Sequence, residues 1–347
     1  MEFGNGRIII ARQTLVNPNM EAPGGAKGPD GEPLSWGRYY ANTYTLETSS
    51  FYWPPGAPGV QPTRIEVHSY ADYTHPIYQY LWGSGSAMHN PGFFRIMQSP
   101  GCHTFGASAW IYIPNSTNAP TSGSMFIQAV NQTPSGGGLV SSVRCSTQPG
   151  WWWLRTGKTH WEWEAEIDSR HLYFRVAKSA NSVSGTIWVA QSRVWIDEMD
   201  LSVQWKAKQG GMPGGWRYRA PNGTHHVRYT GHRDRWQLPV IDVTSSQRHK
   251  LNSWWEEGAS LVMSFQSSMD LADYSDNTEN VRYYYGPGVS SHYGVELPTP
   301  RPFHDVVLSG KNPPITRLDG PTGDMFKGVL DLRTTEGGFP FREGGLL

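Results

Sequence analysis

The segment 105–113, FGASAWIYI, constrains the fold more than any other part of the chain, because its residue types alternate with a period of two. Such alternation is typical of a β-strand that packs one face on a core. The chain therefore needs a sheet around this segment. One face carries Phe105, Ala107, Ala109, Ile111 and Ile113, and the other carries Gly106, Ser108, Trp110 and Tyr112.

Other segments predict further strands, so that the chain from about Leu15 to Ser202 is interpreted as one β-sandwich. Segment 160–167, HWEWEAEI, alternates apolar residues with glutamates, which suits an antiparallel sheet with one wet face. Segments 172–176 and 185–190 predict two short strands. Segment 193–202, RVWIDEMDLS, loses its alternation at Trp195, Asp197 and Asp200, which indicates a strand with a bulge or turn.

Composition points to the same fold class. The 39 Gly and 26 Pro among 347 residues favour short strands joined by turns, and the length allows two cores. The 29 Lys and Arg residues balance the 29 Asp and Glu residues, which disfavours nucleic acid as a partner.

The sequence predicts no membrane insertion and no export signal. No apolar run approaches the roughly 20 residues that span a bilayer, and segment 7–12 is too short for the core of a signal peptide. We therefore expect folding in the cytoplasm of the cell that makes the protein. In that compartment Cys102 and Cys145 are expected to be free thiols, although the sequence leaves open whether they meet.

A second, smaller module follows. Segment 209–215, QGGMPGG, is interpreted as a turn-rich joint, and 216–229 as two short strands around the Pro221-Asn222-Gly223 turn. Segments 236–243 and 261–265 predict two more strands. Between them lies one predicted helix, with an N-cap among residues 244–246 and a C-cap candidate at Gly258. Leu251, Trp254 and Trp255 share one face of this helix.

Two resemblances follow from these patterns. The first resemblance is to the jelly-roll carbohydrate-binding modules of glycan-degrading enzymes and of tailed-phage tail proteins. It is carried by the opening 17–21, NPNME, followed by ASAWIYI, a Trp-rich turn, YFRV and WIDEMDL. It covers about 11–203. It departs from the usual pattern where Ser35-Trp36-Gly37 follows a Gly/Pro-rich insert at 22–33. Residues 205–300 resemble a small module of long-tailed (siphovirus-like) phage baseplate and minor tail proteins.

The expected fold is therefore all-β, with an N-terminal jelly-roll β-sandwich, a smaller β-rich second domain with one helix, and an extended C-terminal arm. The expected boundaries are 1–11 for an N-terminal arm, 12–203 for the jelly roll, 204–300 for the small domain and 301–347 for the arm. Recurrent apolar residues in 301–347 favour an arm that orders on a neighbouring subunit.

No catalytic set stands out, so we expect neither an enzyme nor a cofactor. Glu162, Glu164 and Glu166 alternate along one strand, and a wet sheet face explains them without the facing carboxylates that glycoside hydrolysis requires. Two groups could ligate a metal, but a structural role is favoured for both, so no metal site is predicted. These groups are His68, Asp72 and His75, and His225, His226, His232 and Asp234.

Aromatic residues near turns are the candidates for ligand contact, because sugars rest their C–H faces on aromatic rings. Phe51, Tyr52 and Trp53 precede a Pro-Pro pair, and a Trp triplet follows a Pro-Gly pair. Burial in a core or interface is the favoured reading of both groups. The glycan-binding candidates are Tyr52, Trp53, Trp151, Trp152 and Trp153. The interface candidates are Trp254, Trp255, Tyr283, Tyr284, Tyr285, Phe326 and Phe339.

The function implied by the resemblances is that of a structural component of a tailed-phage virion, a minor tail or baseplate protein. Its expected partners are other phage tail proteins, further copies of itself and host cell-wall glycan. Its expected location is the virion tail, assembled in the host cytoplasm. The alternative is a secreted glycan-active enzyme or its carbohydrate-binding module, and a third reading is a cellular lectin-like protein.

Overall fold

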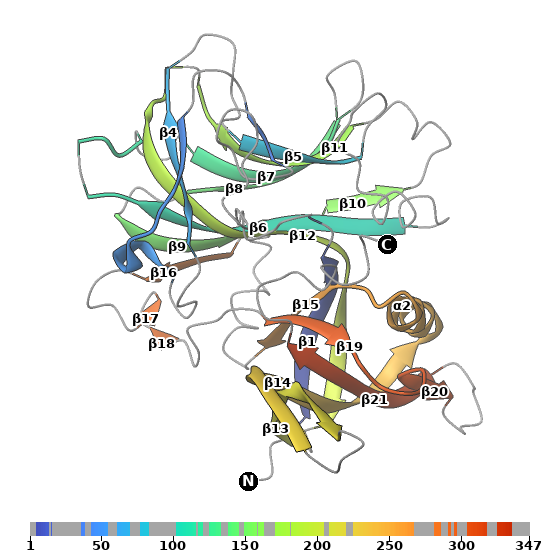
Figure 1. The fold of residues 1–347 in the computed structure, drawn as a ribbon. Helices are drawn as coiled ribbons and strands as arrows, with labels where there is room; N and C mark the ends of the chain where they lie inside the picture. Colours follow the sequence, from blue (N-terminus) through green and yellow to red (C-terminus); the bar gives the residue numbers. More distant parts are fainter. Residues whose placement is uncertain are drawn as a thin grey trace. The chain divides into compact units, whose positions relative to one another are not determined.

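The protein is all-β with one α-helix in the part of the chain that the computed structural model describes (Figure 1). The described residues are 5–13, 15, 36–38, 43–54, 61–69, 77–82, 102–115, 117–120, 125–132, 138–145, 149–157, 159–162, 171–180, 182–204, 208–219, 225–266, 281–285, 291–292, 295–296, 304–317 and 325–334.

Two compact units divide the chain, and the chain passes from the second unit to the first inside the strand β12 (Gly185–Gln204). The first unit combines Met1–Arg12, Met199–Asp270 and Phe303–Leu347, and the second combines Gln13–Glu198 and Leu271–Pro302. The second unit holds the predicted jelly roll. The first unit gathers segments from both ends of the chain, so the units are not consecutive blocks of sequence as the predicted boundaries had them.

The second unit is a sandwich of two sheets, drawn one above the other in Figure 1. Successive strands cross between the sheets at most steps from β4 to β12, as in a jelly roll. One sheet has the order β3 (Thr43–Leu46), β4 (Thr63–Val67), β12, β6 (Cys102–Ile113), β9 (Gly150–Arg155), β16 (Val281–Tyr285), with β10 (Thr159–Glu162) also beside β6. The other has the order β2 (Gly37–Arg38), β5 (Ile77–Trp82), β11 (His171–Lys178), β7 (Met125–Gln132), β8 (Gly138–Arg144). A separate pair joins β17 (Ser291–His292) to β18 (Val295–Glu296).

The core of the sandwich is built from the inward face of each strand. All five apolar residues of the predicted strand 105–113 are in it, which confirms that prediction. The opposing sheet contributes Ile127, Val143 and Phe174, and the Phe174 ring meets Trp36 edge-on at 5.5 Å. Cys145 is buried in the same core and forms no disulfide, so Cys102 and Cys145 do not pair.

Strand β12 joins two segments that the sequence presents as separate strands. Ile187 and Val189 face the sandwich core before Gln191, whereas Val194 and Ile196 face it afterwards, so the inward position changes from odd to even numbers. The pairing with β6 shifts between Ala190 and Arg193, where Gln191 has a φ of 47°. A bulge of one residue therefore keeps the apolar side chains on the core side. The irregularity predicted within 193–202 lies at Asp197, whose φ is 54°.

The first unit is a sheet whose strands pair in a closed circuit, because a late strand in the order pairs again with an early one. The order is β13 (Lys208–Arg219), β14 (His225–Thr244), β21 (Met325–Thr334), β19 (His304–Leu308), β15 (Leu261–Gln266), β1 (Asn5–Gln13), β12, and β12 pairs again with β14 at Ser202 and Val203. A short strand, β20 (Ile315–Arg317), pairs with β21.

The helix α2 (Ser245–Glu256) begins at a complete capping box, in which Thr244 and Gln247 satisfy each other's backbone N–H groups. Leu251 and Trp254 are buried in the core of the first unit, and Trp255 packs against that core and donates its indole N–H to Gly310 O at 2.8 Å. Gly258, at a φ of 61°, follows the C-cap residue Glu257. The helix is where the sequence predicts it.

Both predicted arms are wrong in their described parts, because these parts are strands of the same chain. In β1, Ile8 and Ile10 are buried in the core of the first unit, and Arg12 forms an ion pair of 2.6 Å with Glu257. In the C-terminal region β19, β20 and β21 bring Val306, Leu308, Ile315, Phe326, Leu330 and Leu332 into that core. The recurrent apolar residues noted in this region include Phe326, Leu330 and Leu332, which are buried positions of β21. The segment 209–215, predicted as a joint, lies within β13 and pairs with β14.

An ion pair across β14 and β21 predicts acid sensitivity of the first unit. Arg235 Nε donates to Asp331 Oδ1 at 2.7 Å, a second guanidinium nitrogen contacts Oδ2, and Ser309 Oγ donates to Oδ1 at 3.2 Å. The hydrogen bond from Arg235 is the main reason that the pKa of Asp331 lies below its ordinary value. The unfolded state therefore binds the proton more readily, and this stabilisation is present above pH about 4 and lost as pH falls through the folded pKa.

We expect Asp331→Asn to lower the urea midpoint of unfolding at pH 7 and to flatten its decline between about pH 5 and pH 2. Asp305→Asn, on the neighbouring strand β19, is the matched control, measured by circular dichroism over the same pH series. An unchanged pH profile in Asp331→Asn would contradict this account.

Candidate functional site

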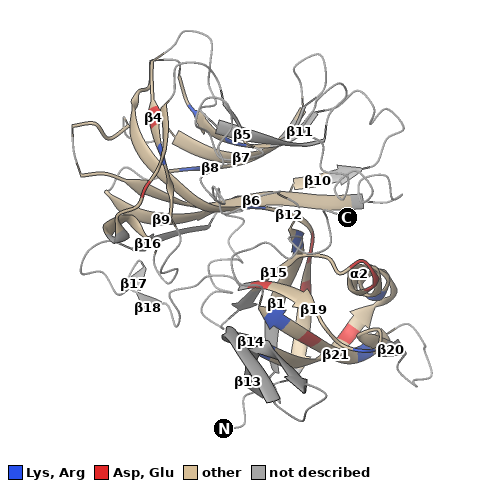
Figure 2. Cartoon of the chain, in the orientation of Figure 1, with Lys and Arg blue, Asp and Glu red and all other residues tan. Residues whose placement is uncertain are grey.

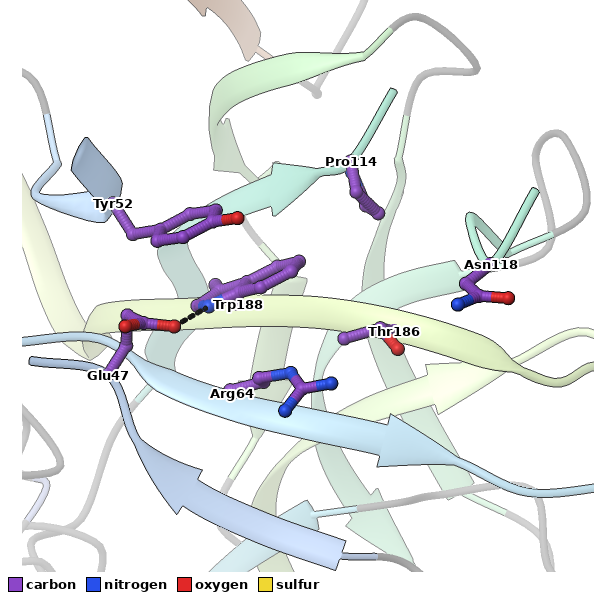
Figure 3. A pocket seen from close by; sticks show the side chains of 7 residues that line it. All are labelled: Glu47, Tyr52, Arg64, Pro114, Asn118, Thr186 and Trp188. Atoms are coloured by element: carbon purple, nitrogen blue, oxygen red, sulfur yellow. Dashed lines mark hydrogen bonds between the residues drawn. The ribbon is translucent and has the colours of Figure 1, made fainter. Parts of the chain in front are cut away.

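A pocket of about 210 Å³ opens on the sandwich unit where β4 and β12 lie side by side. Figure 3 shows the side chains that line it, with Tyr52 and Trp188 at one end and Asn118 at the other. Its volume lies below the range of roughly 300–1,000 Å³ that is usual for sites of drug-sized ligands. The lining residues are Glu47, Tyr52, Arg64, Pro114, Asn118, Thr186 and Trp188.

Trp188 is the fixed centre of the aromatic end. Its ring is stacked on Tyr52 with centroids 4.5 Å apart and planes 6° from parallel, and Tyr112 meets it edge-on at 5.4 Å. Arg64 places its guanidinium carbon 5.9 Å from the Trp188 ring, on the side away from Tyr52 in Figure 3. Because Trp188 is 6% exposed, it forms a wall of the pocket and not an open platform.

Polar groups are fixed around this wall. Trp188 Nε1 donates to Glu47 Oε2 at 3.1 Å, and Ser49 N donates to the other carboxylate oxygen at 3.1 Å. Arg64 pairs with Glu66 at 2.7 Å while its side chain remains 37% exposed. Figure 3 shows the guanidinium of Arg64 and the side chains of Thr186 and Asn118 around the same hollow. The pocket therefore offers donors and acceptors in fixed positions.

Local backbone geometry explains how Asn118 reaches the pocket. The turn 117–120 lies against the start of β12, where Thr186 N donates to Asn118 O at 2.7 Å. Gly185 makes this approach possible, because a Cβ there would lie 2.7 Å from Asn118 O and its φ of 144° is rare for other residues.

Lys178 secures the chain entry into β12. Its Nζ donates to His68 O at 2.9 Å and to Val183 O at 3.2 Å, which ties the end of β4 to the turn before β12. Burial disfavours the charged form and lowers the pKa of Lys178. The two strands that carry Arg64 and Trp188 are thus joined at their ends as well as along their length.

The structure separates the two groups of predicted glycan contacts. Tyr52 lines the pocket, and Trp53 follows it in the chain with a half-buried ring. Trp151, Trp152 and Trp153 are only 5%, 3% and 3% exposed. Trp152 packs in the sandwich core, and the rings of Trp151 and Trp153 lie beside Trp110 and Trp195, respectively. None of the three lines the pocket, and their burial agrees with the favoured interpretation of the triplet as core or interface residues.

The interface candidates also have definite places. Trp254 and Phe326 are buried in the core of the first unit, and Trp255 packs against that core. Tyr283, Tyr284 and Tyr285 form β16, which pairs with the Trp triplet of β9. Phe339 and the metal-candidate residues Asp72 and His75 lie outside the described residues.

The sequence interpretation did not identify Glu47, Arg64, Asn118 or Trp188 as pocket residues. Trp188 could have been recognised, because it falls on the outward face of the predicted strand 185–190 between Ile187 and Val189. Glu47, Arg64 and Asn118 come from three separate segments that only the folded sheet brings together.

Other features of the described residues give less indication of a functional site than this pocket does. A hollow of about 360 Å³ on α2 is lined, among the described residues, by side chains of that helix alone. No group of three metal-ligating residues occurs in the described part of the chain, and the helix found there is too short and too polar to cross a bilayer. Figure 2 shows positive and negative residues interspersed along the described strands, in line with the balanced composition.

No protein-family model and no curated protein matches the sequence. Three solved structures give partial likeness. An arabinose-bound MgGH51 α-L-arabinofuranosidase is 16% identical over 54% of this chain, with a TM-score of 0.34, and this chain spans only 27% of its length. The C-terminal family 22 carbohydrate-binding module of Clostridium thermocellum Xyn10B is 10% identical, covers 48% of this chain and 89% of its own, and has a TM-score of 0.28. The tandem family 22 modules of Paenibacillus barcinonensis Xyn10C are 7% identical, with coverages of 94% and 98% and a TM-score of 0.32. At these identities, the ligand has to be inferred from the residues of this chain.

The Glu47 carboxylate predicts a test of the pocket's construction. Glu47→Ala removes the acceptor of the buried Trp188 indole N–H, and an unpaired buried donor costs about 1–3 kcal/mol of unfolding free energy. Glu47→Gln keeps an acceptor oxygen and should retain most of that stability. Urea unfolding of both variants measures the difference. Equal stability of Glu47→Ala and Glu47→Gln would show that the hydrogen bond does not hold the wall.

Proposed function

We propose that the chain binds a neutral saccharide in the pocket between β4 and β12 and does not cleave it. The observation that carries the proposal is the combination of an aromatic wall with the polar side chains of Glu47, Arg64 and Asn118 around one small hollow. Sugar binding uses such a combination, because the C–H groups of the ring pack on aromatic carbon while the hydroxyls exchange hydrogen bonds with fixed groups.

The charges of the pocket favour a neutral ligand. Arg64 supplies one positive charge, but Glu66 is paired with it and Glu47 lies in the same lining. An anionic sugar would approach two carboxylates and one guanidinium, so its charge would be repelled overall. Hydroxyl groups can instead accept from Arg64 and donate to carboxylate oxygens without adding charge.

The carboxylate content of the lining supports binding without hydrolysis. Glycoside hydrolysis requires two carboxylates on either side of the bond that is cleaved. Among the described residues that line the pocket, Glu47 is the one with a carboxyl group, and its oxygens accept from Trp188 and Ser49. Glu47 therefore serves as a positioning residue for the aromatic wall.

For the biological setting we propose a minor tail or baseplate subunit of a tailed-phage virion, in contact with other tail proteins and further copies of itself. The support is the resemblance of residues 11–203 and 205–300 to modules of tail proteins. In this setting the pocket presents a binding site for host cell-wall glycan. The alternative is a secreted glycan-active enzyme or its carbohydrate-binding module.

The binding proposal predicts the effect of losing Arg64. Hydrogen bonds to a charged group contribute about 1.5–3 kcal/mol, so Arg64→Ala should weaken saccharide binding about tenfold or more. Arg144→Ala is the matched control, since that arginine lies 5.5 Å over the Phe126 ring in the other sheet. Isothermal titration against neutral mono- and oligosaccharides measures both. The proposal is contradicted if no saccharide binds, or if the two variants bind equally well.

The setting is tested separately. Antibody against the purified chain should label the tails of virions from its source in electron micrographs, and incubation with polysaccharide should release no reducing ends. Release of reducing ends with no labelled particle would support the secreted enzyme instead.

A further inference from the structure

Among the described residues, Phe51 is the most exposed large hydrophobic residue, with 71% of its surface open to solvent. It lies beside the pocket and not in its lining. Its ring meets Tyr52 edge-on with centroids 5.0 Å apart, and Tyr52 stacks on Trp188. A single exposed apolar residue is ordinary on a protein surface. The position of Phe51 next to a polar pocket with an aromatic wall is what distinguishes it.

The turn that carries Phe51 is fixed by the same carboxylate that fixes the pocket. Phe51 belongs to the short 3-10 turn η2 (Ser50–Tyr52), where Tyr52 N donates to Ser49 O at 3.1 Å. Ser49 N in turn donates to Glu47 Oε1 at 3.1 Å, and the other oxygen of Glu47 holds Trp188. The backbone that carries Phe51 is therefore held beside the wall, so this turn loses little freedom on binding a ligand.

We propose that Phe51 is a second contact for the same ligand, which is a saccharide chain of at least two linked units. This inference rests on the binding proposed above. The pocket, at about 210 Å³, accommodates a small group, so most of a longer chain must lie outside it. Tyr52 links the hollow to Phe51, because it lines the pocket and its ring also contacts the Phe51 ring. A chain that leaves the pocket across Tyr52 meets the exposed face of Phe51.

The pocket and Phe51 are proposed to recognise different properties of the ligand. Arg64 and Asn118 set which sugar unit enters the pocket, since hydrogen bonds depend on the position of each hydroxyl. Phe51 offers only apolar surface, which accepts the C–H face of a neighbouring unit with little regard to its identity. The chain should therefore select for length as well as for the sugar in the pocket.

The test compares a monosaccharide with its oligomer on the intact chain. The probes are xylose with xylohexaose, arabinose with arabinohexaose, glucose with cellohexaose, and N-acetylglucosamine with chitohexaose, titrated by calorimetry. Phe51→Ala should weaken binding of the hexamer about three- to tenfold and leave binding of the monomer unchanged. Phe51→Tyr should restore hexamer binding. Val140→Ala, at a residue 45% exposed on β8, is the matched control.

The outcomes separate this inference from the function on which it rests. If hexamer binding falls in Phe51→Ala and Arg64→Ala weakens both probes, both proposals stand. The second contact is overturned if wild type binds the monomer and the hexamer with equal affinity. It is also overturned if Phe51→Ala leaves the affinity for the hexamer unchanged while Arg64→Ala lowers it. In both cases the proposal of a saccharide site in the pocket remains. If no probe binds, saccharide recognition itself is overturned.

Discussion

The sandwich and its pocket both depend on the β-bulge at Gln191, a residue whose φ of 47° is in the left-handed region. Before it, Ile187 and Val189 face the core and Trp188 faces outward. After it, Val194 and Ile196 face the core. Without the extra residue, one of these two halves of β12 would turn its apolar side chains to the wrong face, because a shift of one residue exchanges the faces of a strand. Asp197 has a φ of 54°, and after it Met199, Leu201 and Val203 enter the core of the first unit.

This strand also explains why the pocket is rigid. Outward-facing Trp188 is held on three sides, by the Tyr52 stack, the Arg64 guanidinium and the Glu47 carboxylate. The neighbouring strand β4 carries Arg64 directly opposite Trp188 in the pairing register, and Gly185 lets the turn with Asn118 lie against the start of β12. Side chains that are fixed before a ligand arrives lose less conformational entropy on binding. The contacts that hold β4 and the turn with Asn118 against β12 therefore also prepare the pocket.

The sequence was sufficient for features that depend on local patterns. Period-two alternation identified β6, and capping residues with a 3.6-residue pattern identified α2, because in both cases neighbours along the chain carry the signal. It was insufficient where distant segments pair. Ile8 and Ile10 were assigned to an arm because their partners in β15 lie more than two hundred residues away. The glycines of 209–215 predicted a turn-rich joint, although this segment is part of β13. The pocket shows the same limit, since Tyr52 was identified from its turn while Glu47, Arg64 and Asn118 meet only in the folded sheet.

The central claim is that saccharide enters the pocket against Trp188. The most direct measurement is a nuclear magnetic resonance titration that follows the Trp188 indole N–H signal, assigned by its loss in Trp188→Phe. The account predicts that this signal, hydrogen-bonded to Glu47, shifts progressively as a neutral oligosaccharide is added, while the indole signal of Trp254 in the other unit stays in place. Saccharide binding that leaves the Trp188 signal unmoved would contradict the account and place the ligand elsewhere on the chain.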